Sequence, residues 1–215
     1  MNTAAAASIV CIASALALVA AERRNSDAGR WIFKILASTA FIAVAFANGA
    51  QATRYGRLIL LALALSWLGD VLLLSKRESS FLAGIAAFLL AHVAFAFAFA
   101  SLPVTLNEIL FGLLIMSVVG AGLLYWLLPK LSGVFRIAVP AYVAAIVIMC
   151  GIAIAAGVAG NSKLIPLGAL IFAASDVFVA RDRFVEHAFA NKAVGLPLYY
   201  VAQLCLALSV VNMPS

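Results

Sequence analysis

The chain has 215 residues, of which 67% are apolar and 10% are charged. A soluble domain is typically about 45–50% apolar and about 25% charged, and a domain of this size cannot bury so much apolar surface in its own core. The composition therefore excludes an ordinary soluble fold and indicates a protein solvated by lipid. The formal net charge of +6 is better explained by orientation in a membrane than by nucleic-acid binding, which we do not expect.

Eight apolar runs follow one another along the chain, and each reaches or approaches the roughly 20 residues that a transmembrane helix needs. In lipid the backbone must satisfy its hydrogen bonds within each segment, which favours helices, and no run shows the alternating polarity of a barrel strand. The sequence predicts an all-α polytopic bundle of about eight transmembrane helices in a single integral membrane domain, residues 1–215. The runs are Thr3–Ala21, Trp31–Ala47, Arg57–Leu74, Phe81–Ser101, Glu108–Leu128, Phe135–Val158, Lys163–Ala180 and Ala193–Met213.

The basic residues favour one set of loops. Because charge follows the first run instead of preceding it, we expect a retained first helix and not a cleaved signal peptide. The loops after the first, third, fifth and seventh runs, with their edges, carry Arg23, Arg24, Arg30, Lys76, Arg77, Lys130, Arg136, Arg181, Arg183 and Lys192, whereas the opposite loops carry Arg54, Arg57 and Lys163. The positive-inside rule then predicts that both termini lie outside, in what we expect to be a bacterial inner membrane.

A short motif recurs about half a chain apart. The segment from Gly69 to Arg77 (GDVLLLSKR) is similar to the segment from Ser175 to Arg183 (SDVFVARDR). With four helices in each half, the two copies would have the same orientation, which predicts a parallel internal repeat.

The recurring motif carries the two aspartates that lie inside apolar runs, where an ionisable group is costly and usually functional. Asp70 lies four residues before Leu74, and Asp176 lies four residues before Ala180, so each would sit about 6 Å below the same membrane boundary. If their helices are neighbours, the carboxyl groups share a partly dry site in which one can hold a proton while the other stays charged. Alternatively, each bonds a nearby lysine or caps a helix end.

Five more polar side chains are candidates to bind substrate. Lys34 could pair with an aspartate or a lipid phosphate, or extend to the headgroups as many membrane lysines do. His92 could position substrate or water, or make a plain contact between helices. Tyr199, Tyr200 and Gln203 fall in the inner half of the last run, where tyrosine is common at the interface, and Tyr200 and Gln203 can share a helix face.

Other chemistries find little support in the sequence. There is no nucleophile-elbow serine motif, phosphate-binding loop or dinucleotide fingerprint. The two histidines, His92 and His187, are too few for a three-histidine zinc site. Cys11, Cys150 and Cys205 each lie within an apolar run and are expected to act as small buried side chains. We expect neither a metal ion nor an organic cofactor.

At these residues the chain resembles the YhhN-type membrane proteins, a family that includes the lysoplasmalogenases. Lys34 is similar to the family's lysine in the second helix, although Ile35 stands where proline often follows, and Phe95 stands where tyrosine is frequent. The motifs that carry the resemblance are Gly69-Asp70-Val71-Leu72-Leu73-Leu74, Phe81-Leu82-Ala83-Gly84 with Phe88 and His92, Gly168-Ala169-Leu170-Ile171-Phe172-Ala173-Ala174-Ser175-Asp176, Arg183-Phe184 and Tyr199-Tyr200-Val201-Ala202-Gln203.

The resemblance implies a hydrolase for the vinyl ether bond of lysoplasmalogen, a single-chain lipid, with Asp70 and Asp176 as the catalytic pair. The products would be a fatty aldehyde and glycerophosphoethanolamine or glycerophosphocholine. Two other functions fit the residues alone. A proton-coupled transporter or lipid-binding membrane protein would also use buried carboxylates and parallel repeats, and a structural membrane subunit would need neither aspartate.

Overall fold

The structure is a computed structural model that describes residues 3–75 and 77–211. These residues form eight long α-helices and two short 3-10 helices, with no strand among them, which confirms the predicted all-α class. Lys76, in a predicted loop, and Met213, the predicted end of the last run, lie outside the described residues. The helices are α1 (Thr3–Arg23), α2 (Asp27–Ala47), α3 (Arg54–Leu72), α4 (Glu78–Ala100), α5 (Leu106–Leu127), α6 (Phe135–Val158), α7 (Leu164–Phe184) and α8 (Phe189–Leu208), with η1 (Ala50–Ala52) and η2 (Leu128–Lys130).

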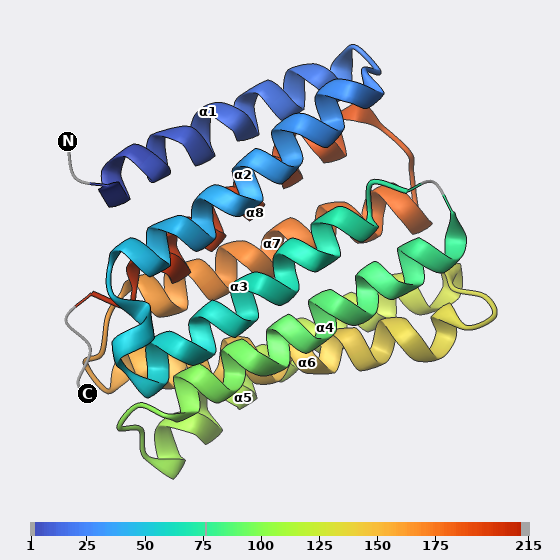
Figure 1. The fold of residues 1–215 in the computed structure, drawn as a ribbon. Coiled ribbons are helices and arrows are strands. Elements are labelled where there is room, and N and C mark those ends of the chain that lie inside the picture. The colour runs from blue at the N-terminus through green and yellow to red at the C-terminus, as the bar shows by residue number, and fades with distance from the viewer. Residues whose placement is uncertain (1–2, 76, 212–215) are drawn as a thin grey trace.

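The helices form four antiparallel pairs, α1 with α2, α3 with α4, α5 with α6 and α7 with α8. The pairs join into one bundle because α4 packs on α6, α1 and α2 both pack on α8, and α2 also packs on α3 and α6 on α7. In Figure 1 α1 begins and α8 ends at one end of the bundle, and the loops after α1, α3, α5 and α7 lie at the other. The structure thus gathers at one end the four loops that carry most of the basic residues.

Polar residues in the connections set several helix starts. The Ser26 hydroxyl accepts from the Gly29 amide at the start of α2, and the Thr53 hydroxyl accepts from the Gly56 amide at the start of α3. At the start of α5, Thr105 and Glu108 form a reciprocal capping box. Each of these contacts satisfies backbone donors that a helix start leaves free.

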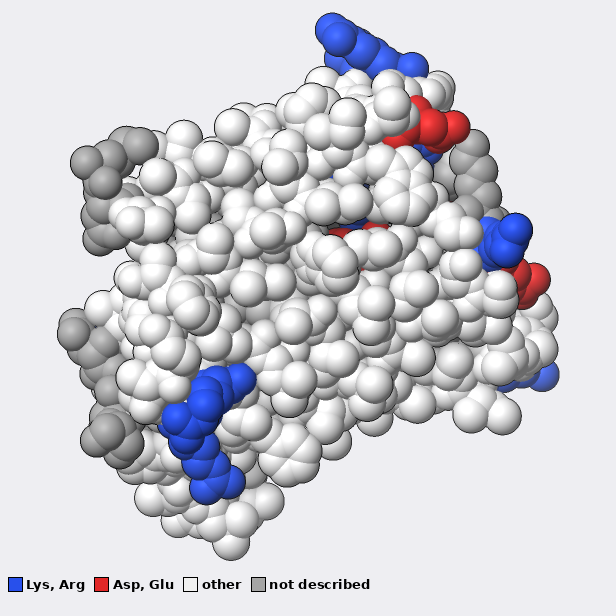
Figure 2. Space-filling model, viewed as in Figure 1, with Lys and Arg blue, Asp and Glu red and all other residues white. Residues whose placement is uncertain are grey.

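Seven helices, α1 to α7, are long and apolar enough to cross a membrane. α8 is of similar length but is not among them, because Asn191, Lys192, Tyr199, Tyr200 and Gln203 lower its apolarity. Most of these polar side chains face the bundle interior, since all but Lys192 are buried. In Figure 2 the charged side chains lie toward the two ends of a mostly uncharged face, and a few charged atoms show through a recess between the ends.

Two sequence expectations about helix arrangement need comment. α3 ends at Leu72, two residues after Asp70, whereas α7 continues past Ala180 to Phe184. The predicted run ends at Leu74 and Ala180 therefore differ from the helix ends, because Arg181 and Arg183 continue α7 as its last turn, where basic side chains favour a helix. The shared depth of the two aspartates below the membrane boundary stays a prediction. The parallel internal repeat is not established by the structure and stays a prediction.

Candidate active site

A cavity of about 580 Å³ lies inside the bundle, in the half nearer the loops after α1, α3, α5 and α7. All eight helices contribute residues to its wall, and most of the lining side chains are apolar. Asp70 and Asp176 both line this cavity. The two aspartates singled out by the sequence therefore line one cavity.

Asp70 is a buried carboxyl group surrounded by donors from two other helices. It is 3% exposed. The Ser38 and Tyr199 hydroxyls donate to its Oδ2 at 2.5 and 2.7 Å, and Lys34 Nζ lies 3.4 Å from Oδ1. Lys34 and Ser38 come from α2, one turn apart, and Tyr199 comes from α8. The cation and the two hydrogen-bond donors favour the charged form of this carboxyl group, against the effect of its burial.

Asp176 has a different set of partners. Its Oδ2 accepts a hydrogen bond from the Tyr142 hydroxyl at 3.2 Å, and His92 Nε2 lies 3.2 Å from the same oxygen. His92 is fully buried, its Nδ1 is 2.6 Å from the Phe88 carbonyl oxygen, and its ring packs on Phe172 with centroids 4.6 Å apart. This second carboxyl group therefore faces neutral or titratable groups from α6 and α4, in contrast to the lysine that faces Asp70.

The two aspartates line the same cavity but come from different helix pairs. α3 and α7 are not among the closely packed helix pairs of the described chain. Phe172 lies between the two sets of partners, with its ring 4.6 Å from His92 and 5.5 Å from Tyr199, measured between centroids. The two carboxyl groups therefore line one cavity with separate sets of partners.

The structure divides the five predicted substrate-binding residues. Lys34 and Tyr199 line the cavity and contact Asp70, and His92 lies behind Asp176. Tyr200 and Gln203 are buried in α8 but are not part of the cavity wall. The Tyr200 hydroxyl lies 3.4 Å from Ser38 Oγ, whereas neither polar atom of the Gln203 side chain has a hydrogen-bond partner among the described residues.

Ser38 was missed by the sequence analysis, and the role of Tyr142 was not foreseen. A serine inside an apolar helix is common and carries no signal of its own, because it can bond its own backbone. Its position one turn after Lys34 on α2 would have been the clue, since residues four apart share a helix face. Tyr142 lies on α6, and only the packing of α6 on α7 brings it to Asp176.

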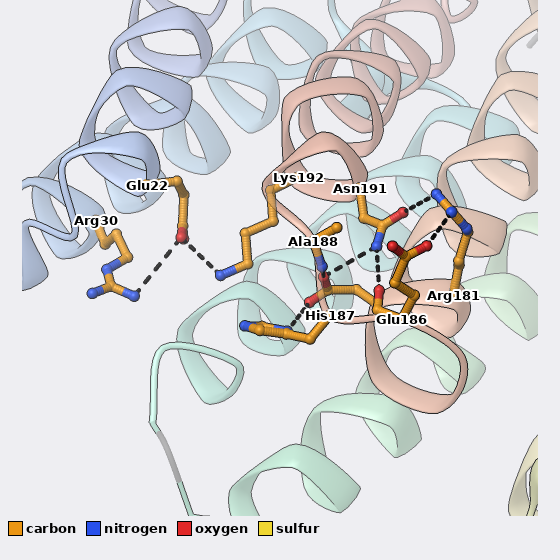
Figure 3. A network of polar contacts seen from close by, with 9 residues as sticks. Glu22, Arg30, Arg181, Glu186, His187, Ala188, Asn191 and Lys192 are labelled. Atoms are coloured by element: carbon orange, nitrogen blue, oxygen red, sulfur yellow. Dashed lines mark hydrogen bonds and ion pairs between the residues drawn. The ribbon is translucent and has the colours of Figure 1, made fainter.

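The cavity is charged at the end nearer the loops. We call this end the mouth and define it by Glu22, Arg30, Asp182, Arg183, His187 and Lys192, all of which line the cavity. Figure 3 shows Glu22 of α1 between Lys192 of α8, at 2.9 Å, and Arg30 of α2, at 3.7 Å. The Arg183 guanidinium lies 4.4 Å from the centre of the Phe81 ring and has no carboxylate partner among the described residues. The mouth thus offers cations at the rim of an apolar space.

Seven helices that are long and apolar enough to cross a membrane identify the chain as a multi-pass integral membrane protein. Two aspartates line the cavity inside its helical bundle. The chain belongs to the YhhN family, whose model matches residues 29–210 and so begins within α2. This confirms the resemblance drawn from the motifs.

Curated relatives named lysoplasmalogenase match the chain. It is 33% identical over 161 residues to lysoplasmalogenase TMEM86A of Bos taurus, covering 72% of this chain and 65% of that protein. It is 34% identical over 161 residues to the Homo sapiens protein of the same name, with the same coverage. It is 33% identical over 157 residues to lysoplasmalogenase TMEM86B of Sus scrofa, covering 71% of this chain and 63% of that protein. The chain thus matches just under two thirds of the length of these relatives. No solved structure matches it.

Proposed function

We propose that this protein is a membrane hydrolase that cleaves the vinyl ether bond of lysoplasmalogen. The products would be a fatty aldehyde and glycerophosphoethanolamine or glycerophosphocholine. The observation that carries the proposal is the pair of aspartates, Asp70 and Asp176, on the wall of one largely apolar cavity. The name lysoplasmalogenase, which three relatives at 33–34% identity bear, supports the choice of substrate.

The proposed reaction needs one protonated and one charged carboxyl group. The protonated acid donates its proton to the vinyl carbon that is not bonded to oxygen, and positive charge develops on the ether oxygen and its carbon. The charged carboxylate stabilises this oxocarbenium ion and takes a proton from the water that attacks it. The hemiacetal then breaks its bond to the glycerol oxygen, which receives the hydroxyl proton. The arrangement is analogous to glycoside hydrolysis by two carboxyl groups.

The position of Lys34 changes the part we propose for it. The sequence made it a candidate for the phosphate contact, but its ammonium group lies 3.4 Å from Asp70 and its side chain is only 12% exposed. We propose instead that Lys34 stabilises the charged form of Asp70. The phosphate of a single-chain lipid would instead meet the cations of the mouth, with its tail extending into the apolar part of the cavity.

We also propose that both termini lie outside a bacterial inner membrane, so that the mouth opens toward the cytoplasm. The support is the distribution of basic residues, which gather in the four loops at the end of the mouth. The positive-inside rule assigns such loops to the cytoplasm.

The proposal predicts that the purified protein releases aldehyde from lysoplasmalogen but not from the saturated-ether analogue, whose alkyl carbon cannot be protonated. Asp70→Asn and Asp176→Asn should each lower aldehyde release by at least about 100-fold, as loss of general acid–base catalysis does. Measuring aldehyde in detergent separates hydrolysis from transport, which needs a sealed membrane.

The matched control is Glu78→Gln, which neutralises an exposed carboxylate in the first turn of α4. It should keep wild-type activity. Thermal unfolding of the variants separates a loss of catalysis from a loss of fold, and Asp70→Asn, which leaves the buried Lys34 without its anion, should be the less stable of the two aspartate variants. Undiminished turnover by either aspartate variant, or aldehyde from neither lipid with wild-type protein, would refute the proposal.

A further inference from the structure

The tautomer of His92 is fixed by its surroundings. Nδ1 lies 2.6 Å from the Phe88 carbonyl oxygen, which can only accept a hydrogen bond. Nδ1 must therefore carry a hydrogen, whatever the total charge of the ring. A neutral His92 then has its lone pair at Nε2, the atom that faces Asp176.

The approach of Nε2 to Asp176 is favourable when the two side chains share a proton. Nε2 lies 3.2 Å from Oδ2. If the imidazole were neutral and the carboxylate charged, the lone pair of Nε2 would face the negative Oδ2 at this distance, and the two atoms would repel each other. The contact is attractive if the ring is protonated or if the carboxyl group is protonated, and in both cases the pair holds one proton. The two atoms lie within ion-pair distance but do not have the geometry of a hydrogen bond, and such contacts are often poorly aligned in a site without substrate.

Asp70 has the opposite setting. The ammonium group of Lys34 and the hydroxyls of Ser38 and Tyr199 all present hydrogens to it. A proton on the Asp70 carboxyl would compete with these donors, so its partners favour the carboxylate. The two aspartates of the cavity are thus made unequal by the side chains that α2, α4, α6 and α8 supply.

We propose that Asp176 is the general acid and that His92 is a positioning residue which keeps the proton on this pair, while Asp70 works as the charged partner. This rests on the proposed function. Asp176, which lines the cavity, donates its proton to the vinyl carbon and becomes a carboxylate. Asp70 then accepts one proton from the attacking water, and that proton returns to the Asp176–His92 pair before the next turnover. No net proton is gained or lost.

The protonation of His92 can be measured without any turnover. The chain has two histidines, so nitrogen NMR of ¹⁵N-histidine-labelled protein in detergent gives two ring spectra, and His187→Gln identifies that of His92. We expect a hydrogen on Nδ1 and an Nε2 shift displaced from that of a bare ring nitrogen. Asp176→Asn should move the Nε2 signal, and Asp70→Asn, the matched control, should leave it in place. An unprotonated Nδ1, or an Nε2 shift that Asp176→Asn leaves unchanged, would overturn the pairing.

The division of roles can be tested with lysoplasmalogen in D₂O. In Asp70→Asn the acid can still protonate the vinyl carbon, and the ion then loses a hydrogen back to Asp176. The recovered lipid should therefore contain deuterium at that carbon. Asp176→Asn should give lipid with at least about tenfold less deuterium. Deuterium incorporation by Asp176→Asn, or by neither variant, would overturn the assignment.

His92 itself is tested by separating binding from chemistry. Because His92 is not part of the cavity wall, His92→Gln should lower kcat by at least about tenfold and leave KM within about twofold. His92→Asn, which can keep the contact with Phe88 but cannot reach Asp176, should do the same if it folds. Unchanged kcat in both variants would overturn the role of His92. If wild-type protein releases no aldehyde, the proposed function fails, while the NMR measurement still decides the His92–Asp176 pairing.

Discussion

Lys34 and Asp70 form a buried ion pair, and such a pair is most sensitive to the loss of one partner. Their side chains are 12% and 4% exposed. Lys34→Met should destabilise the protein by about 3–5 kcal/mol, because it leaves a carboxylate buried without its cation. Adding Asp70→Asn should recover most of this stability, since the uncompensated charge is removed, without restoring activity. Thermal unfolding in detergent and aldehyde release measure the two effects.

Lys192 provides the comparison for this prediction. It pairs with Glu22 at the mouth with its side chain 31% exposed, and exposed ion pairs contribute at most about 1 kcal/mol. Lys192→Met should therefore change stability far less than Lys34→Met. Equal losses of stability in Lys34→Met and Lys192→Met would show that the buried Lys34–Asp70 pair is no more sensitive to the loss of its cation than the exposed Lys192–Glu22 pair.

Tyr199 and Tyr200 are adjacent in sequence but differ in their contacts, which makes them a matched pair. The Tyr199 hydroxyl donates to Asp70 at 2.7 Å, whereas that of Tyr200 lies 3.4 Å from Ser38. A hydrogen bond to a charged group contributes about 1.5–3 kcal/mol, so Tyr199→Phe should lower kcat/KM by about 10- to 100-fold. Tyr200→Phe should lower it by less than about fivefold. Steady-state kinetics of both variants decides this, and a larger effect at Tyr200 would reverse our reading of the site.

Much of the candidate site could be predicted at the level of residues because charged and aromatic polar side chains stand out in apolar runs. Asp70, Asp176 and Lys34 were found in this way. Their pairing was not, since the sequence does not say which lysine approaches which aspartate. Ser38 could not be predicted, because a serine hydroxyl can form its hydrogen bond with a backbone carbonyl of its own helix and therefore needs no functional partner.

The pairing of α5 with α6 depends on two glycines that bring the helices together. A Cβ added at Gly112 would lie well inside van der Waals contact with the backbone carbonyl of Gly151, whereas one added at Gly122 would meet nothing within 4 Å. Gly112→Ala should cost about 1–3 kcal/mol, as overpacking does. Gly122→Ala, on the same helix, should be neutral or slightly stabilising. Thermal unfolding in detergent compares them, and equal stability of the two variants would argue against close packing at Gly112.

The number and order of the helices could be predicted, with ends that differ by up to four residues at Asp27, Phe184 and Phe189, but their neighbours could not. Length and apolarity define a helix in lipid, whichever face it buries. A helix that is apolar all round has no stripe to mark its buried side. The sequence therefore left open whether the helices of Asp70 and Asp176 touch. In the structure α3 packs chiefly on α4 and α7 on α8, and the cavity brings the aspartates to a common space.

The whole molecule has a predicted orientation that reporter fusions can test. With both termini outside, alkaline phosphatase fused to the C-terminus should be active and green fluorescent protein fused there should be dark. Fusions ending at His187, in the loop between α7 and α8, should give the reverse pattern. A fluorescent C-terminal fusion would place the mouth on the other side of the membrane.

The cavity is charged at its mouth and apolar along the rest, so the two products of a cleaved lipid would leave it by different routes. If the bond breaks between Asp70 and Asp176, the glycerol fragment is left among Arg183, Lys192 and bulk water, where it diffuses off as an ordinary solute. The aldehyde is left among apolar side chains that adjoin the bilayer, and partitions into it. We therefore expect water-soluble glycerophosphodiesters to inhibit weakly, and long-chain aldehydes to accumulate around the protein and slow it.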